Sequence, residues 1–306
     1  MISQIRNIAK KIRYNLIVEF YNALYILWAK TQYSPKVVSI DDTINLIISN
    51  KCSVSRFGDG EILLTENQSI GFQQADNLLA KRLSDVFKSS SDNHLVCISD
   101  VFYDLNRYNR RARRFWRTHF FLYGYIWEKL IDKNRIYYNT FITRPYMDFA
   151  LKSKSGEWFN LLKKIWDGRD IVFIEGEKSR LGVGNSLFSN SRSIKRILCP
   201  PTNAFNKYNL ILAEAIKIDK NSLILIALGP TATVLAYDLH KLGYQAIDIG
   251  HVDIEYEWYN MKATHKVKIS NKFVNEQPGG DNVKNVIEKT YHDQVISNLN
   301  SNQYVN

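Results

Sequence analysis

The chain has 306 residues, of which 45% are hydrophobic and 13% aromatic, and this composition excludes a globally disordered protein. Lysine and arginine outnumber aspartate and glutamate by 41 to 30. The formal net charge of +11 favours a polyanionic partner, which can be nucleic acid, anionic lipid or a phosphorylated substrate. Cys52, Cys97 and Cys199 are far apart and match no zinc spacing, so we expect buried free thiols in a reducing cytoplasm.

Residues 1–36 are predicted to form a basic amphipathic helical segment. Six lysines and arginines stand against a single acid, Glu19, and apolar residues from Ile12 to Trp28 recur at helical spacing. Such a helix can lie in a membrane interface, or it can pack on the main domain or on a second subunit. The segment is too short and polar to span a bilayer, and no secretory signal is evident. We therefore expect a cytoplasmic protein, with peripheral contact to the inner face of the plasma membrane as an option.

From Ser39 onwards, apolar runs of strand length alternate with segments of helical periodicity. The expected strands are 53–57, 95–99, 170–174, 194–199, 223–228 and 246–249. The expected helices begin at Ser39 and then cover 74–88, 156–166, 207–218 and 231–242. Residues 139–146 are strand-like, and the tail beyond 260 is predicted to be a loop with a final helix. This alternation predicts an α/β protein with a mostly parallel sheet.

A basic run lies between the second and third of the expected strands. Residues 107–117 contain six arginines and no acid, and on a helix Arg107, Arg110, Arg111 and Arg114 share one face. Nucleic-acid binding is one interpretation. We favour a solvated helix face or a basic rim that attracts a phosphorylated substrate, because a single basic helix is not a nucleic-acid-binding module.

Four polar clusters fall where predicted strands end, and ligands bind at that edge of an open parallel sheet. The first follows the strand 53–57. In it, Asp59 and Glu61 can converge on one hard cation, and Gly58 and Gly60 allow close approach of the backbone. Arg56 can pair with a phosphate. The alternative is an ordinary turn with an Asp cap.

The second cluster is the glycine-bearing loop 175–186. Its backbone N–H groups and the side chains of Lys178, Ser179 and Arg180 suit an anionic ligand. The loop matches neither the P-loop nor the dinucleotide fingerprint, so a mobile surface loop is the alternative.

The third cluster is Gly229-Pro230-Thr231, between a strand and a helix. The free N–H groups of such a helix start can hold a phosphate, although a tight turn with a Thr cap is equally consistent with the sequence.

The fourth cluster follows the strand 246–249. In extended chain, His251, Asp253 and Glu255 would face one site, which suits a metal or an acid/base pair. The alternative is an edge strand with a solvated acidic face.

Six motifs in this order resemble those of the GT-D glycosyltransferases, formerly domain of unknown function 1792. They are Arg56-Phe-Gly-Asp-Gly-Glu61, Thr143-Arg-Pro-Tyr146, Gly176–Asn185, Asn203-Ala-Phe205, Leu228–Thr233 and Asp248–Trp258. The resemblance covers roughly residues 40–265. It implies a Rossmann-like sheet with helices on both faces, a UDP-sugar donor, and a divalent metal, Mn²⁺ or Mg²⁺, at an Asp-X-Glu motif.

The resemblance also assigns roles. Of the two Asp-X-Glu motifs, Asp59/Glu61 is favoured as the metal site over Asp253/Glu255, because glycines flank it. One of His251, Asp253 and Glu255 would contact or deprotonate the acceptor hydroxyl. The substrate-binding residues would be Arg56, Arg144, Glu177, Ser179, Arg180, Gly184, Asn185, Asn203, Gly229, Pro230 and Thr231.

We therefore expect the chain to consist of three segments: the helical residues 1–36, a GT-D domain at 37–265, and a loop and helix extension at 266–306. The enzyme would move a hexose, with glucose as first candidate, to a saccharide acceptor in surface polysaccharide or glycoprotein glycan assembly. That acceptor is expected to be lipid-linked or part of a glycoprotein. The alternative is a basic nucleotide- or nucleic-acid-binding protein without enzymatic activity.

Overall fold

The computed structural model describes residues 2–28, 34–102, 104–283 and 288–300. The strands are β1 (Lys36–Val37), β2 (Ser53–Phe57), β3 (His94–Ile98), β4 (Ile136–Asn139), β5 (Asp170–Gly176), β6 (Ser193–Cys199), β7 (Leu223–Ala227), β8 (Gln245–Asp248) and β9 (Val295–Asn298). The α-helices are α1 (Ile2–Trp28), α2 (Ile40–Asn50), α3 (Asp59–Thr65), α4 (Asn77–Lys88), α5 (Arg110–Leu130), α6 (Ser155–Trp166), α7 (Tyr208–Ala215), α8 (Pro230–Lys241), α9 (Val252–Asn260) and α10 (Lys289–Gln294). Short 3₁₀ helices follow two of the strands, and they are η2 (Thr140–Thr143) after β4 and η3 (Ala204–Lys207) after β6.

The strands form a sheet in the order β1-β4-β3-β2-β8-β7-β5-β6-β9, and every pairing in it is parallel. The centre of this order is the neighbouring pair β2 and β8, which are joined at a single register position, Val54 opposite Ile247. From there the sheet extends through β3 and β4 on one side and through β7, β5 and β6 on the other. This is the topological switch point at which open α/β sheets bind ligands.

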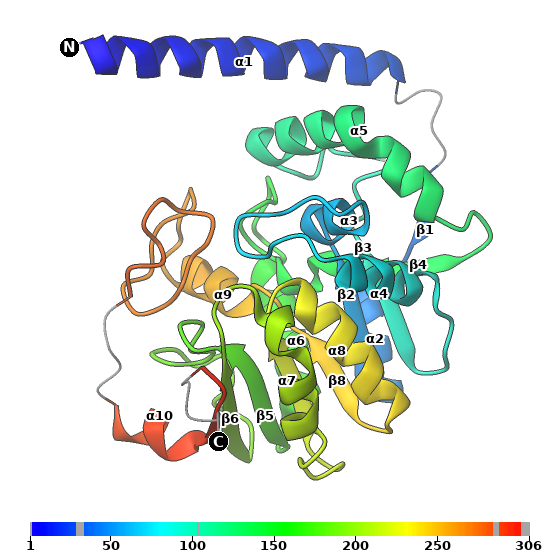
Figure 1. Ribbon diagram of the computed structural model, residues 1–306, viewed down its shortest axis with the longest axis vertical. Coiled ribbons are helices and arrows are strands. Elements are labelled where there is room, and N and C mark those ends of the chain that lie inside the picture. Colours follow the sequence, from blue (N-terminus) through cyan, green and yellow to red (C-terminus); the bar gives the residue numbers. More distant parts are fainter. Residues whose placement is uncertain (1, 29–33, 103, 284–287, 301–306) are drawn as a thin grey trace.

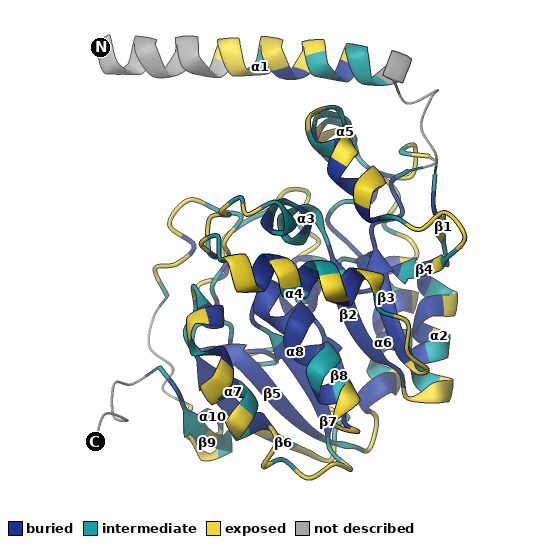
Figure 2. Cartoon of the chain, turned by 45° about the vertical axis from the view of Figure 1, so that its right-hand side comes forward, coloured by how far each residue is buried: buried dark blue, intermediate teal, exposed yellow. Residues whose placement is uncertain are grey.

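Helices cover both faces of the sheet, with α4, α7 and α8 on one side and α2 and α6 on the other (Figures 1 and 2). Strands that are covered on both faces have continuous apolar sequences. Strand β7 (Leu-Ile-Leu-Ile-Ala) is an example, and its first four residues are buried. The three cysteines are buried free thiols, as predicted. The predicted α/β fold with a parallel sheet is confirmed.

Residues 2–28 form the helix predicted for the N-terminal segment, and this helix, α1, lies along α5 (Figure 1). The rest of the predicted helical segment up to residue 33, together with residue 1, lies outside the described residues. Asn22 donates to the Arg114 carbonyl and to Thr118, while Tyr21 stacks on Phe121 at 5.1 Å between ring centroids. Packing on the main domain, one of the three predicted options, is therefore observed.

Three local predictions were wrong. Residues 251–255 are not extended, because α9 begins at Val252. Residues 140–143 form the 3₁₀ helix η2 rather than strand, after the short strand β4. The tail contains the predicted short helix α10, but it also supplies β9, which pairs with β6 at the edge of the sheet.

Candidate active site

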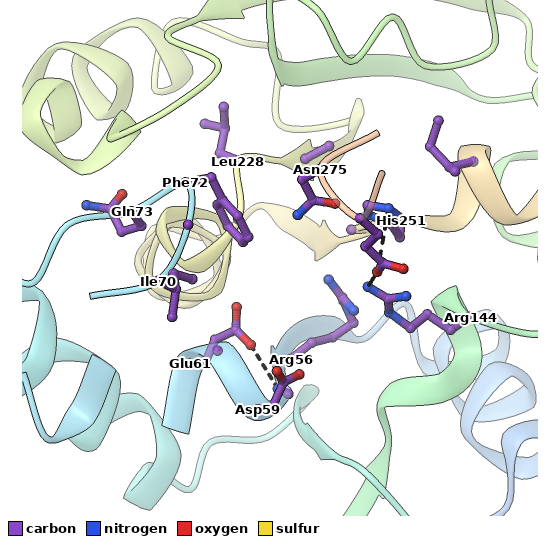
Figure 3. Close-up of a pocket in the computed structure, with 18 of the residues that line it drawn as sticks. Arg56, Asp59, Glu61, Ile70, Phe72, Gln73, Arg144, Leu228, His251 and Asn275 are labelled. Atoms are coloured by element: carbon purple, nitrogen blue, oxygen red, sulfur yellow. Dashed lines mark hydrogen bonds and ion pairs between the residues drawn. The ribbon is translucent and has the colours of Figure 1, made fainter. Parts of the chain in front are cut away.

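The sheet carries a pocket of about 550 Å³ at its carboxyl edge (Figure 3). Each strand from β2 to β8 ends at it, because Gly58, Ser99, Thr140, Gly176, Pro200, Leu228 and Gly250 all line the pocket. The prediction that the strand ends gather polar residues at one edge is therefore confirmed. A pocket of this size holds a ligand as large as a nucleotide or a disaccharide.

Arg56, at the end of β2, is clamped across the centre of the sheet. Its Nε and Nη2 donate to the carbonyl and the Oδ1 of Asp248 at 2.9 and 2.8 Å, and Nη1 donates to Thr143 Oγ1 at 2.7 Å. Gly250, at φ +46°, makes room for this clamp, since an added Cβ would lie 1.9 Å from Nη2 of Arg56. Arg56 lines the pocket as predicted, but protein groups already engage three of its nitrogen atoms.

Asp59 and Glu61 both line the pocket, as predicted, from the first turn of α3 rather than from an isolated turn (Figure 3). Glu61 Oε2 accepts the N–H of Gly58 at 2.9 Å. Burial and the nearby Asp248 carboxylate raise the pKa of Glu61 to about 7. Burial also raises the pKa of Asp59, although the charge of Arg144 opposes this. A cation bound between these two side chains would stabilise their ionised, carboxylate forms.

A charged cluster lies across the pocket from these acids. Glu276 pairs with Arg144 at 2.5 Å and with Lys266, and His251 Nε2 lies 3.9 Å from Glu276 Oε1. Burial opposes the ionisation of Glu276, but Arg144, His251 and Lys266 outweigh it and hold its pKa below the ordinary value. Burial, followed by the charge of Arg144, lowers the pKa of His251 to about 3, so its imidazole is neutral at pH 7.

Asp253 and Glu255, for which a catalytic role was predicted, make structural contacts. On α9 they no longer share a direction with His251. Asp253 Oδ1 accepts the N–H of Gly182 at 2.9 Å, and its Oδ2 pairs with the buried Lys272 at 2.6 Å. Glu255 Oε2 accepts two backbone N–H groups, from Tyr146 at 3.0 Å and Met147 at 2.7 Å. Of the three predicted catalytic residues, His251 and Asp253 line the pocket and Glu255 does not. Only His251 lines it without a hydrogen bond to another described group.

Most side chains named as candidates in the loop 175–186 contact other protein groups rather than the pocket. Glu177 pairs with Asn300, and Asn185 donates to Asp253 at 2.8 Å and to Glu257 at 2.7 Å. Arg180 donates to the Asn271 carbonyl at 2.9 Å. Ser179 lines the pocket, whereas Glu177, Arg180, Gly184 and Asn185 do not, and a substrate contact of these four residues stays a prediction.

The Gly229 turn reaches the pocket only through its first residue. Pro230 and Thr231 open α8 and are buried, and no hydrogen-bond partner of Thr231 Oγ1 is found among the described residues. Phe72 covers the turn, since a Cβ on Gly229 would lie 2.6 Å from Phe72 Cε2. Neither Pro230 nor Thr231 lines the pocket, and a substrate contact of these two residues stays a prediction.

Asn203, also predicted, lines the pocket and holds the loop that carries Phe72. Its backbone N–H donates to the Phe72 carbonyl at 2.9 Å, and its Oδ1 accepts the N–H of Gln74 at 2.7 Å.

Sequence reasoning missed three groups of pocket residues. They are the loop residues Ile70, Gly71, Phe72 and Gln73, the α5 residues Arg111, Phe115 and Trp116, and the late residues Lys266, Phe273, Asn275 and Glu276. The run of arginines at 107–117 was the one available signal, and interpreting it as a basic rim points to α5. The late residues lie beyond residue 265, yet they complete the pocket.

The fold and the site define an α/β protein with its pocket at the switch point of a parallel sheet. A family model, described as glycosyltransferase GT-D fold, matches residues 54–277. The chain therefore belongs to the GT-D family of glycosyltransferases, and the resemblance inferred from the six motifs is confirmed.

Relatives and solved structures agree with this assignment. The chain is 42% identical over 265 residues to the "Probable glycosyl transferase Gly" of Streptococcus gordonii, and 40% identical over 265 residues to the "Glycosyltransferase GlyD" of Streptococcus pneumoniae serotype 4. Each match covers 86% of this chain, which spans only 39% and 32% of the lengths of these two relatives.

Two solved structures share the fold. One, described as showing that the conserved domain of unknown function 1792 has a distinct glycosyltransferase fold, matches with a TM-score of 0.84 and 45% identity, covering 87% of this chain and 96% of that chain. Another, described as a new glycosyltransferase from Streptococcus sanguinis, has a TM-score of 0.84 and 41% identity, covering 87% of this chain and all of that one (100%).

Proposed function

We propose that this glycosyltransferase moves a hexose, with glucose as first candidate, from a UDP-sugar to a saccharide acceptor with the help of a divalent metal. The observation that carries the proposal is the convergence of Arg56, Asp59, Glu61 and Gly229 on one pocket at the switch point of a GT-D chain. A pyrophosphate needs cations and backbone N–H groups at such a place.

Asp59 and Glu61 would hold the metal. Mg²⁺ and similar ions are bound by one or two carboxylates together with substrate phosphates, and these two acids supply that number. No group of three or more His, Cys, Asp or Glu residues that could hold a metal occurs among the described residues, so the remaining ligands would be diphosphate oxygens and water. The bound metal would neutralise the charge that develops on the departing UDP.

His251 is our candidate for contact with the acceptor hydroxyl. It lines the pocket, and its Nε2 is buried with no hydrogen-bond partner among the described residues. A pKa of about 3 leaves the imidazole neutral but makes it a weak base. We therefore assign it a hydrogen-bonding role in orienting the acceptor rather than proton abstraction.

We further infer that α1 rests on the cytoplasmic face of an anionic membrane, which suits an acceptor used in surface polysaccharide assembly. The face of α1 turned away from α5 exposes Leu16 at 67% and Phe20 at 61%, together with Ile12. None of the helices in the described parts of the chain combines the length and the apolar character needed to cross a bilayer. Surface contact fits a basic amphipathic helix of this kind, and sedimentation with anionic vesicles tests it.

The donor proposal is tested by following UDP release from UDP-glucose in the presence of Mn²⁺, and again after EDTA is added. We expect release that depends on the metal and that falls at least about 100-fold in Asp59→Asn, the scale of losing a group that stabilises leaving-group charge. A panel of other UDP-hexoses, run in parallel, identifies the sugar. If none of the donors yields UDP, the proposal is wrong.

A further inference from the structure

Helix α5 forms a second wall of the pocket, separate from the strand ends. Arg111, Ala112, Phe115 and Trp116 line the pocket, and their spacing places them on one face of the helix. The neighbouring face carries α1 through Arg114 and Thr118. One helix thus contacts both the pocket and the N-terminal segment.

The ring on this wall is exposed and held in position. Phe115 is 46% exposed although it is a large apolar residue on a pocket wall. The buried Trp116 meets it edge-on at 5.3 Å, and His119 stacks against it at 6.0 Å between centroids. A fixed aromatic face of this kind packs well against the apolar C–H face of a sugar ring.

Beside this ring lies a cation that the protein does not neutralise. Arg107 pairs with Asp100 at 2.8 Å, and Arg114 pairs with Glu19 at 2.9 Å. For Arg111, no ion pair or hydrogen bond of the side chain is found within the described parts of the chain. Its exposed guanidinium is therefore available to an anion, and a guanidinium binds phosphate oxygens in a bidentate manner.

The geometry points to α5 as the acceptor subsite, with Phe115 packing on the acceptor sugar and Arg111 binding a phosphate or diphosphate attached to that sugar. This inference rests on the proposed function, because it assigns the donor to the strand-end side of the same pocket. A glycosyl phosphate is the ligand class, whether it is water-soluble or linked to a lipid.

The test uses calorimetry on the full chain saturated with UDP and Mn²⁺, so that the donor side is occupied. The probes are glucose 1-phosphate, a prenyl diphosphate-linked glucose in detergent micelles, and neutral methyl glucoside. We expect both charged probes to bind at least about tenfold more tightly than methyl glucoside, the effect of one charge-assisted hydrogen bond. Tighter binding of the prenyl probe than of glucose 1-phosphate would indicate a lipid-linked acceptor, and equal binding a soluble one.

Matched variants test whether Arg111 and Phe115 are responsible for the binding of these probes. Arg111→Gln should remove the preference for the charged probes, whereas Arg110→Gln, an equal loss of charge on an exposed arginine that does not line the pocket, should keep it. Phe115→Ala should weaken all three probes, and Leu122→Ala, another partly exposed α5 residue, should weaken none.

Affinity for UDP should be unchanged in all four variants, which separates this inference from the donor proposal. Equal behaviour of Arg111→Gln and Arg110→Gln, or no preference for charged probes in the wild type, would overturn the acceptor subsite. Loss of UDP binding by the wild type would instead refute the donor proposal, and the subsite with it.

Discussion

Arg56 links the two halves of the sheet through Asp248, and Gly250 leaves the space that this contact needs. Replacing Gly250 by Ala forces a side chain into a left-handed backbone conformation and places its Cβ 1.9 Å from Nη2 of Arg56. We expect a loss in the free energy of unfolding of about 3–5 kcal/mol, because Asp248 would lose its buried partner.

Gly168 supplies the control for this substitution. It also has a left-handed backbone, at φ +62°, but an added Cβ there meets nothing within 4 Å. Gly168→Ala should therefore cost only the backbone strain, about 1–2 kcal/mol. Urea unfolding measures both variants, and equal losses would show that Arg56 does not depend on the space at Gly250.

The raised pKa of Glu255 predicts that the stability of the protein depends on pH. Burial and the nearby Asp148 raise its pKa from 4.5 to about 7, so the folded protein keeps this proton through a range in which the unfolded chain has lost it. Stability must then fall as pH rises from about 4.5 to 7, relative to a variant without the charge. Against Glu255→Gln, we expect the wild type to lose about 3 kcal/mol across this window.

Urea unfolding of both proteins at several pH values measures this difference. A constant difference from pH 5 to pH 7.5 would contradict the raised pKa.

At the scale of the elements, the sequence predicts those whose apolar pattern is set by the sheet. The unit β7–α8–β8 follows its prediction within a residue or two at each boundary, because a buried apolar strand and a helix that begins with proline are both locally encoded. Helix α9 was missed because Asp-Ile-Glu-Tyr-Glu alternates in polarity like a strand. Two of its acids are in fact buried, Asp253 against Lys272 and Glu255 against backbone N–H groups. Strand β9 has four residues at the sheet edge, too few for a pattern.

The membrane inference depends on the exposed apolar residues of α1, Ile12, Leu16 and Phe20. Replacing Leu16 and Phe20 together by Gln removes two large apolar side chains that make no described contact with α5, so folding should be retained. Burying each side chain in a bilayer interface contributes about 1.5–3 kcal/mol, so we expect at least about a tenfold loss of binding to anionic vesicles in a sedimentation assay.

The double variant Leu210→Gln and Leu242→Gln removes two exposed leucines from α7 and the end of α8, away from α1, and should bind vesicles like the wild type. Equal binding by both double variants would exclude α1 as the membrane contact.

At the scale of the whole molecule, the site is assembled from segments far apart in the chain. The sequence predicts those pocket residues that lie at or just after strand ends, including Arg56, Asp59, Ser179 and Gly229, because parallel strands bring their carboxyl ends together. It could not predict that α5 and residues 266–276 close the same pocket, since tertiary packing alone brings them there. For the same reason Asp253, which follows a strand, could not be recognised as the partner of Lys272.

The central claim is that this pocket binds a UDP-sugar through a metal held by Asp59 and Glu61. Calorimetric titration of UDP into the full chain, first with Mn²⁺ and then with EDTA, tests it most directly. We predict binding that weakens at least about tenfold in EDTA and in Asp59→Asn, the loss of a charge-assisted contact. Failure to bind UDP, or equal affinity under all of these conditions, would contradict the account.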